Sequence, residues 1–132
     1  MPLEEYSLAR GDDFESCGGM VTSHTTRDLA GSTLLIEAAI VLHAEPEAIL
    51  EVLEVVVLGD DGLCHRQRYG YRLIYERLEL FRYDRDARNH PDMPDHKHVG
   101  DRRFPSGPIG FREFVEEAWD WINERRGGAA GR

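Results

Sequence analysis

The sequence predicts an α+β fold: an antiparallel β-meander of about four to five strands packed against one C-terminal α-helix, with an irregular N-terminal extension. Three observations support this prediction. Two apolar runs follow each other between residues 33 and 58, side chains alternate along residues 68–84, and a helical apolar period occupies residues 109–126. A helix on one face of an antiparallel sheet buries the apolar side of both.

The length of 132 residues is typical of one domain. We expect an irregular or partly disordered extension over 1–32, a single α+β domain over 33–126 and a flexible tail over 127–132. The chain has no stretch of 18 uninterrupted apolar residues and its start has no basic head or apolar core, so we expect no membrane partner and a cytoplasmic protein. Two separated cysteines, Cys17 and Cys64, are interpreted as reduced thiols.

The first 32 residues are rich in Gly, Ser, Thr and Asp and show no sustained period. Residues 1–10 could form a short helix, which the following GDDFESCGG would end. We therefore expect this segment to be ordered, if at all, against a partner.

The two apolar runs, TLLIEAAIVL and EAILEVLEVVVL, predict a hairpin with strands near 34–42 and 48–58. The turn between them is expected around Glu45 and Pro46, and Asp60, Asp61 and Gly62 indicate a second turn. A helix that begins after Pro46 is the main alternative, because proline is favoured at the first helical position.

The next stretch, RYGYRLIY, alternates between two faces. The link Glu76–Arg77 joins it to LELFRYD, so both segments are predicted as antiparallel neighbours. The row of aromatic side chains either packs beneath the C-terminal helix or stacks nucleic-acid bases on an open sheet. The row consists of Tyr69, Tyr71 and Tyr75. Packing beneath the helix is favoured, and it places Arg66, Arg68 and Arg72 on the opposite face of the sheet, toward solvent.

After this pair, DRDARNHPDMPD and DRRFPSGP are predicted as loops on either side of a short extended segment, HKHVG. The final helix is expected over 109–126, with Gly127 at its end. Its apolar positions recur at helical spacing: Phe111, Phe114, Val115, Ala118 and Ile122.

The net charge of −9 hides an asymmetry between segments. Residues 1–63 sum to −11, residues 64–103 to +3 and residues 104–132 to −1, with His neutral. An anionic partner would bind the middle segment and be repelled by the first, provided that the fold keeps them apart. The alternative is that arginine and glutamate alternate along exposed strands for solubility.

The motif His96-Lys97-His98 is the sharpest chemical feature, because residues two apart in an extended chain share a face. Two adjacent imidazoles can act as acid and base in RNA cleavage without a metal. The predicted catalytic residues are His96, His98, Arg82 and Asp84, and the predicted substrate-binding residues are Arg66, Arg68, Arg72, Tyr83 and Lys97.

Two other interpretations of the histidines stay open. In the first, His96 and His98 only form hydrogen bonds to the loop backbone near Asp95 and Asp101. A zinc site is the other alternative, with nitrogens from His90, His96 and His98 and an oxygen from Asp92 or Asp95. Because HxH in a loop is a weak signal, we assign no cofactor and no metal.

Three spaced motifs resemble the TumE family, toxins of prokaryotic type II toxin–antitoxin pairs. They are His65-Arg66-x-Arg68-Tyr69-x-Tyr71, then Arg82-Tyr83-Asp84, then His96-Lys97-His98-Val99, and the similarity extends over about residues 33–126. The sequence departs from the family pattern at Arg85, where an asparagine is usual, and in the first 32 residues.

The resemblance implies a toxin partnered by a DNA-binding antitoxin. The ribonuclease chemistry is inferred from residue types, so the chain is expected to be either an RNA-cleaving toxin or a non-catalytic module that binds protein or nucleic acid through the same face. RNA and a second copy of the chain are further partners left open by the sequence, since an exposed edge strand invites pairing.

Overall fold

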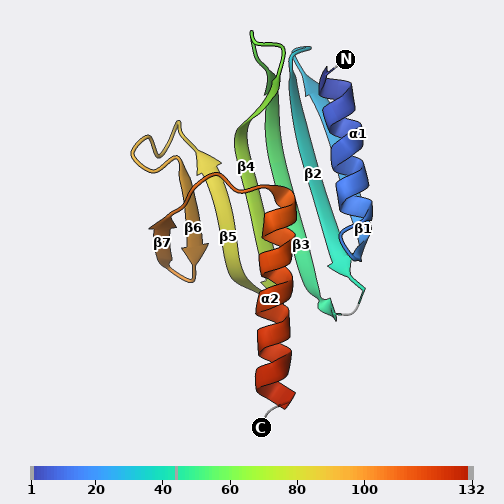
Figure 1. The fold of residues 1–132 in the computed structure, drawn as a ribbon, viewed down its shortest axis with the longest axis vertical. Coiled ribbons are helices and arrows are strands. Elements are labelled where there is room, and N and C mark those ends of the chain that lie inside the picture. The colour runs from blue at the N-terminus through green and yellow to red at the C-terminus, as the bar shows by residue number, and fades with distance from the viewer. Residues whose placement is uncertain (1, 44, 131–132) are drawn as a thin grey trace.

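One seven-stranded antiparallel sheet forms the body of the protein, and the computed structural model describes residues 2–43 and 45–130 of it (Figure 1). The strands follow their chain order across the sheet, so every strand pairs with its neighbours in sequence. The strands are β1 Gly19–Leu29, β2 Thr33–Leu42, β3 Glu45–Leu58, β4 Cys64–Tyr75, β5 Leu78–Asp86, β6 Asp95–Val99 and β7 Arg102–Pro105. This arrangement is the predicted meander, with more strands than the four to five expected.

Two helices cover one face of this sheet: α1 (Pro2–Glu15) lies beside β1 and β2, and α2 (Phe111–Ala130) crosses β3 and β4 (Figure 1). The helices meet through the rings of Phe14 and Phe111, whose centroids are 5.1 Å apart. Between helices and sheet lies the core, in which side chains at helical spacing meet alternate residues of the strands. The predicted positions of α2 that are buried include Phe111, Phe114, Ala118 and Ile122.

The prediction of an irregular segment over residues 1–32 is wrong, because α1 and β1 occupy most of it. Proline at the first helical position and acidic residues in the first turn favour the start of α1. The helix continues through Gly11, where a stop was expected, because tertiary contacts bury Leu3 and Phe14. It ends before Gly18, which has a φ of 93°.

The central strands agree with the sequence. The hairpin of β2 and β3 and the pair of β4 and β5 are confirmed, and the helix considered after Pro46 is a strand instead. The turn predicted around Glu45 and Pro46 is wrong, because β3 already begins at Glu45. Glu76 and Arg77 both have positive φ, as a two-residue hairpin turn of the primed type requires.

Two segments at the C-terminal end differ from the predicted bounds. The stretch expected as a loop after the histidine motif contains β7, which pairs with β6. Helix α2 runs to Ala130 through most of the predicted tail, and the last two residues of that tail lie outside the described residues. In the described part of the chain, neither helix combines the length and apolarity needed to cross a lipid bilayer.

A register shift between β3 and β4 changes which arginines share a face. Val55 pairs with Arg68 and the next residue, Val56, pairs with Arg66, so β4 has one extra residue there. A β-bulge of this kind interrupts the alternation of side chains. Arg66 therefore points to the helix side, whereas Arg68 and Arg72 point away from it, and the prediction that all three face solvent is wrong for Arg66.

Candidate functional site

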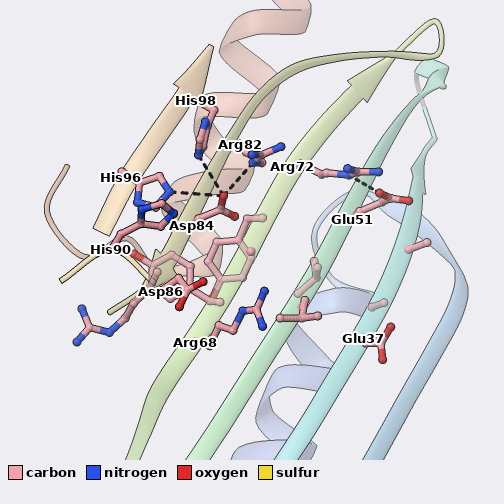
Figure 2. Close-up of a pocket in the computed structure, with 18 of the residues that line it drawn as sticks. Glu37, Glu51, Arg68, Arg72, Arg82, Asp84, Asp86, His90, His96 and His98 are labelled. Atoms are coloured by element: carbon pink, nitrogen blue, oxygen red, sulfur yellow. Dashed lines mark hydrogen bonds and ion pairs between the residues drawn. The ribbon is translucent and has the colours of Figure 1, made fainter. Parts of the chain in front are cut away.

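Asp84 lies at the centre of a polar cluster on the sheet face that the helices leave uncovered (Figure 2). In the pairing of β5 with β6, Asp84 is opposite His96 and Arg82 is opposite His98. Paired residues project to the same side of a sheet, and residues two apart on a strand do as well. The register therefore brings all four predicted catalytic side chains onto the open face.

The distances within this cluster are short. Oδ2 of Asp84 lies 3.3 Å from Nε2 of His98 and 3.7 Å from Nε2 of His96. The same oxygen accepts a 2.8 Å hydrogen bond from Nε of Arg82. Of the two rings, His98 therefore lies nearer the carboxylate at the end of β5, and the distance from His96 is too long for a hydrogen bond.

His96 is buried, with 2% of its surface exposed. The loop before β6 covers it rather than α2: its ring contacts His90, at a centroid distance of 5.1 Å, and its Nδ1 lies 3.0 Å from the carbonyl oxygen of Met93. A carbonyl oxygen only accepts hydrogen bonds, so Nδ1 carries a proton. Nε2 of His96 is consequently the nitrogen that faces Asp84.

His98 is the more accessible of the two rings, with 19% of its side chain exposed, and its centroid is 4.7 Å from that of His96. Burial lowers the pKa of His98, and the positive charge of Arg82 lowers it further, against the opposing effect of Asp84. The lowered pKa favours a neutral imidazole at pH 7. A neutral ring beside a carboxylate can accept a proton from a bound substrate.

A chain of ion pairs extends from the cluster across the open face. Arg82 also contacts Glu79 at 3.4 Å, and Arg72 lies 3.7 Å from the same carboxylate. Arg72 in turn donates a 2.5 Å hydrogen bond to Glu51 of β3 (Figure 2). Arg68 makes no ion pair within the described part of the chain. Hydrogen bonds from Asn89 lower the pKa of Asp86, and the charge of Arg68 lowers it further.

These side chains line a groove of about 590 Å³ on the open face. Its lining includes four arginines and four carboxylates, so the groove has no net charge apart from its three histidines. Two of the carboxylates, Glu37 and Glu51, belong to the acidic first half of the chain. The fold therefore does not keep the acidic and basic segments apart at this groove.

Three residues predicted to bind substrate lie on the other face, against the helices. Nζ of Lys97 is 2.6 Å from Glu117 of α2, and Tyr83 donates a 2.5 Å hydrogen bond to the same carboxylate. Arg66 donates to the hydroxyl of Tyr71 and to the carbonyl of Ile109. In this structure Lys97 and Tyr83 connect the sheet to α2, and Arg66 connects it to the segment just before α2. Arg68 and Arg72 lie in the groove with the histidines.

The tyrosine row packs beneath the helices, as favoured from the sequence. Tyr69 and Tyr71 are buried, and the ring of Tyr71 stacks on Phe114 with a centroid distance of 5.5 Å. Tyr75 is only partly buried, because the register shifts between Leu73 and the residue after it. The row is therefore not an exposed platform for stacking bases.

Gly70 is a site residue that sequence reasoning missed. It pairs with Asp84, and a Cβ atom built on it would lie 3.2 Å from Oδ1 of Asp84. A glycine in the interior of an alternating strand often marks a close approach, and this signal was available in RYGYR. The absence of a side chain at Gly70 gives the carboxylate room.

Among the described residues, one group has the geometry to ligate a metal ion: Asp84, His96 and His98, whose ligand atoms all lie within 4.8 Å of one another. The set considered from the sequence differs in its carboxylate. Asp95 is turned to the helix side, where it accepts hydrogen bonds from Tyr69 and Arg85. Asp84 supplies the carboxylate instead of Asp95. It is distant from His96 in sequence but lies opposite His96 on the neighbouring strand.

Comparison with known proteins gave one match. A family model described as Toxin TumE matches residues 19–126, most of the chain. The match begins within β1 and ends within α2, so it includes the whole sheet and all residues of the cluster. No curated protein and no solved structure matches.

Proposed function

Since the chain belongs to the TumE toxin family, with the toxin role and the cognate antitoxin that such a family implies, we propose that it acts by cleaving RNA at the groove of β5 and β6. The observation that supports this proposal is the convergence of His96 and His98 on the carboxylate of Asp84. We further propose that the antitoxin is a DNA-binding protein, as the family resemblance implies.

In the proposed reaction, Asp84 and His98 act together as the base. Nε2 of His98 lies 3.3 Å from Oδ2 of Asp84. In the tautomer that carries its proton on this nitrogen, Nδ1 of His98 has a free lone pair. This nitrogen takes the proton of an RNA 2′-hydroxyl. The carboxylate orients the ring and stabilises the imidazolium that forms, as in other carboxylate–histidine pairs.

The second histidine supplies the proton that completes the cleavage. As the 2′-oxygen bonds to the adjacent phosphorus, the bond from phosphorus to the 5′-oxygen breaks, and protonated His96 gives its Nε2 proton to that leaving oxygen. The products are a 2′,3′-cyclic phosphate and a 5′-hydroxyl. The charge balance needs no metal: one proton leaves the 2′-hydroxyl and one arrives at the 5′-oxygen.

The arginines of the groove supply positive charge to the substrate. Arg82 is 2.8 Å from Asp84, and in the proposed reaction it would stabilise the charged phosphorane beside the two rings. Arg68 and Arg72 extend along the groove toward β3, where they would contact neighbouring phosphates. Because the carboxylates of the groove balance these arginines, we expect modest RNA affinity that weakens with salt.

The proposal is tested with the double variant H96A/H98A and the matched control H65A. His65 is the appropriate control because it lies on β4, is exposed, and pairs with Asp61 away from the groove. We expect induced parent and H65A to arrest growth and to cleave RNA in EDTA, and the double variant to lose at least about 10³-fold in cleavage rate with its fold intact. Growth arrest by the double variant as strong as that of the parent would show that the histidines have no such role.

A second candidate function is a non-catalytic module that holds a partner through the same face. It is favoured by the ion pairs of the groove, since Arg72 and Arg82 already contact carboxylates and can exchange them for charged groups of a partner. This candidate predicts binding without turnover. Capture of RNA or antitoxin by the parent with no cleavage of any RNA supplied would favour it over the ribonuclease.

A further inference from the structure

The carboxylate and the two imidazoles of the groove have the spacing of a metal site. Tetrahedral zinc with bonds of about 2.0–2.1 Å holds its ligand atoms about 3.3 Å apart. Asp84 and His98 present oxygen and nitrogen at 3.3 Å, and Asp84 and His96 at 3.7 Å. All three ligand atoms lie within 4.8 Å of one another, so small side-chain rotations would bring them into a coordination sphere with one position left open.

The surroundings of His96 suit ligation, and the 3.7 Å from its Nε2 to Oδ2 of Asp84 is too long for a hydrogen bond. Its Nδ1–H donates to the carbonyl oxygen of Met93 at 3.0 Å, which is the backbone interaction that usually orients a metal-binding imidazole. In the neutral ring, Nε2 then has a lone pair directed toward the Asp84 carboxylate. In that state two acceptors face each other at 3.7 Å, and either a proton on Nε2 or a metal ion can occupy the space between them.

We propose that Asp84, His96 and His98 bind a divalent transition-metal ion of the zinc class, and that the bound metal inhibits the protein. The inhibitory effect rests on the proposed function, whereas metal binding does not. With the ion on Nε2 of both rings, His96 has no proton to give. His98, neutral and bound through Nε2, carries its proton on Nδ1 and has no lone pair to accept another.

Arg82 sets the expected strength of this site. Its guanidinium already donates to Oδ2 of Asp84 at 2.8 Å, and a carboxylate oxygen can accept that bond while it ligates a metal. The positive charge nevertheless repels a divalent ion, so the site is expected to be weaker than a structural zinc site. Replacing Arg82 with Gln should therefore tighten metal binding by about tenfold while it impairs RNA cleavage.

Metal binding is measured on the full chain after treatment with EDTA and removal of the chelator. We expect one equivalent of Co²⁺ to give the visible absorption of tetrahedral cobalt, and calorimetry with Zn²⁺ to give one site. The variants H96Q and H98Q should each weaken binding by at least about tenfold, the R82Q variant should strengthen it, and H65Q should leave it unchanged. Circular dichroism identifies any variant that has lost its fold. If a histidine variant is unfolded, D84N is used in its place, because it removes the third ligand of the site.

Binding that is absent, or that is equal in parent, H96Q and H98Q, would overturn the metal site. RNA cleavage is then measured with and without one equivalent of Zn²⁺. Loss of cleavage that EDTA restores is the expected result, and faster cleavage with Zn²⁺ would overturn the inhibitory role. One-site binding in a protein that cleaves no RNA in EDTA would refute the ribonuclease proposal and its inhibition while leaving the metal site standing.

Discussion

Replacing Glu54 with Gln should destabilise the protein strongly, because this carboxylate anchors α1 to the sheet. Glu54 lies on β3 and is fully buried. It accepts hydrogen bonds from the hydroxyl of Tyr6 at 2.8 Å and from Nε of Arg10 at 2.9 Å, and also from the hydroxyl of Tyr71. All three of its donors would lose a charged acceptor in the variant.

The magnitude follows from the burial of both partners. The side chain of Arg10 is 14% exposed and that of Glu54 is 0% exposed, so removal of the carboxylate leaves a charge in a mostly dry environment. Breaking a buried ion pair in this way costs about 3–5 kcal/mol. Arg10 retains Asp13 at 2.8 Å, which places the expected loss near the lower limit, about 3 kcal/mol, or about 10 °C in Tm.

The assay is urea unfolding followed by circular dichroism, with E51Q as the matched control. Glu51 lies on the same strand and pairs with Arg72, but those side chains are 41% and 44% exposed, so its loss should stay below about 1 kcal/mol. A loss in E54Q no larger than the loss in E51Q would refute the claim that a buried ion pair holds α1.

Three further predictions concern the two faces of the sheet. Burial raises the pKa of Tyr69 to about 12, whereas in the unfolded chain it is near 10. The contribution of the neutral Tyr69 hydroxyl to stability should therefore be complete below pH 10 and lost as the pH rises to 12. The measurement is the difference in unfolding free energy between the parent and Y69F, which should shrink over that range. Gly70→Ala should displace the Asp84 carboxylate by a few tenths of an ångström and slow RNA cleavage by about tenfold, with the unfolding free energy changed by less than about 1 kcal/mol. Arg68→Met should weaken RNA binding and Lys97→Met should not, because only the first lies in the groove; equal losses in a binding assay would contradict this division.

The sequence predicted the middle of the fold well because local patterns determine it there. Alternation in RYGYRLIY, the apolar runs before it and the turn at Asp60 to Gly62 each specify their own segment. The helical period of α2 is equally local. The N-terminal segment lacked such a pattern, since α1 is ordered by distant partners such as Glu54, which is 44 residues away from Arg10.

The candidate site was predicted in part for the same reason. Two-residue spacing placed His96 and His98 on one face, and the strand end Arg82–Asp84 was expected beside them. The bulge that turns Arg66 toward the helices has no sequence signal. One extra residue in β4 moves the side chain of Arg66 to the other face of the sheet, and the alternation of residue types in the sequence does not reveal it. The pairing of β5 with β6 likewise selected Asp84 over Asp95, and only the register determines it.

The most direct test of the central claim is the chemical identity of the ends that the purified protein leaves on RNA in the presence of EDTA. Mass spectrometry of the fragments should find 2′,3′-cyclic phosphates and 5′-hydroxyls, and a substrate with a single 2′-deoxynucleotide at the cleavage position should remain intact. Fragments with 3′-hydroxyl ends, or cleavage that persists at the 2′-deoxy position, would contradict acid–base catalysis by His96 and His98.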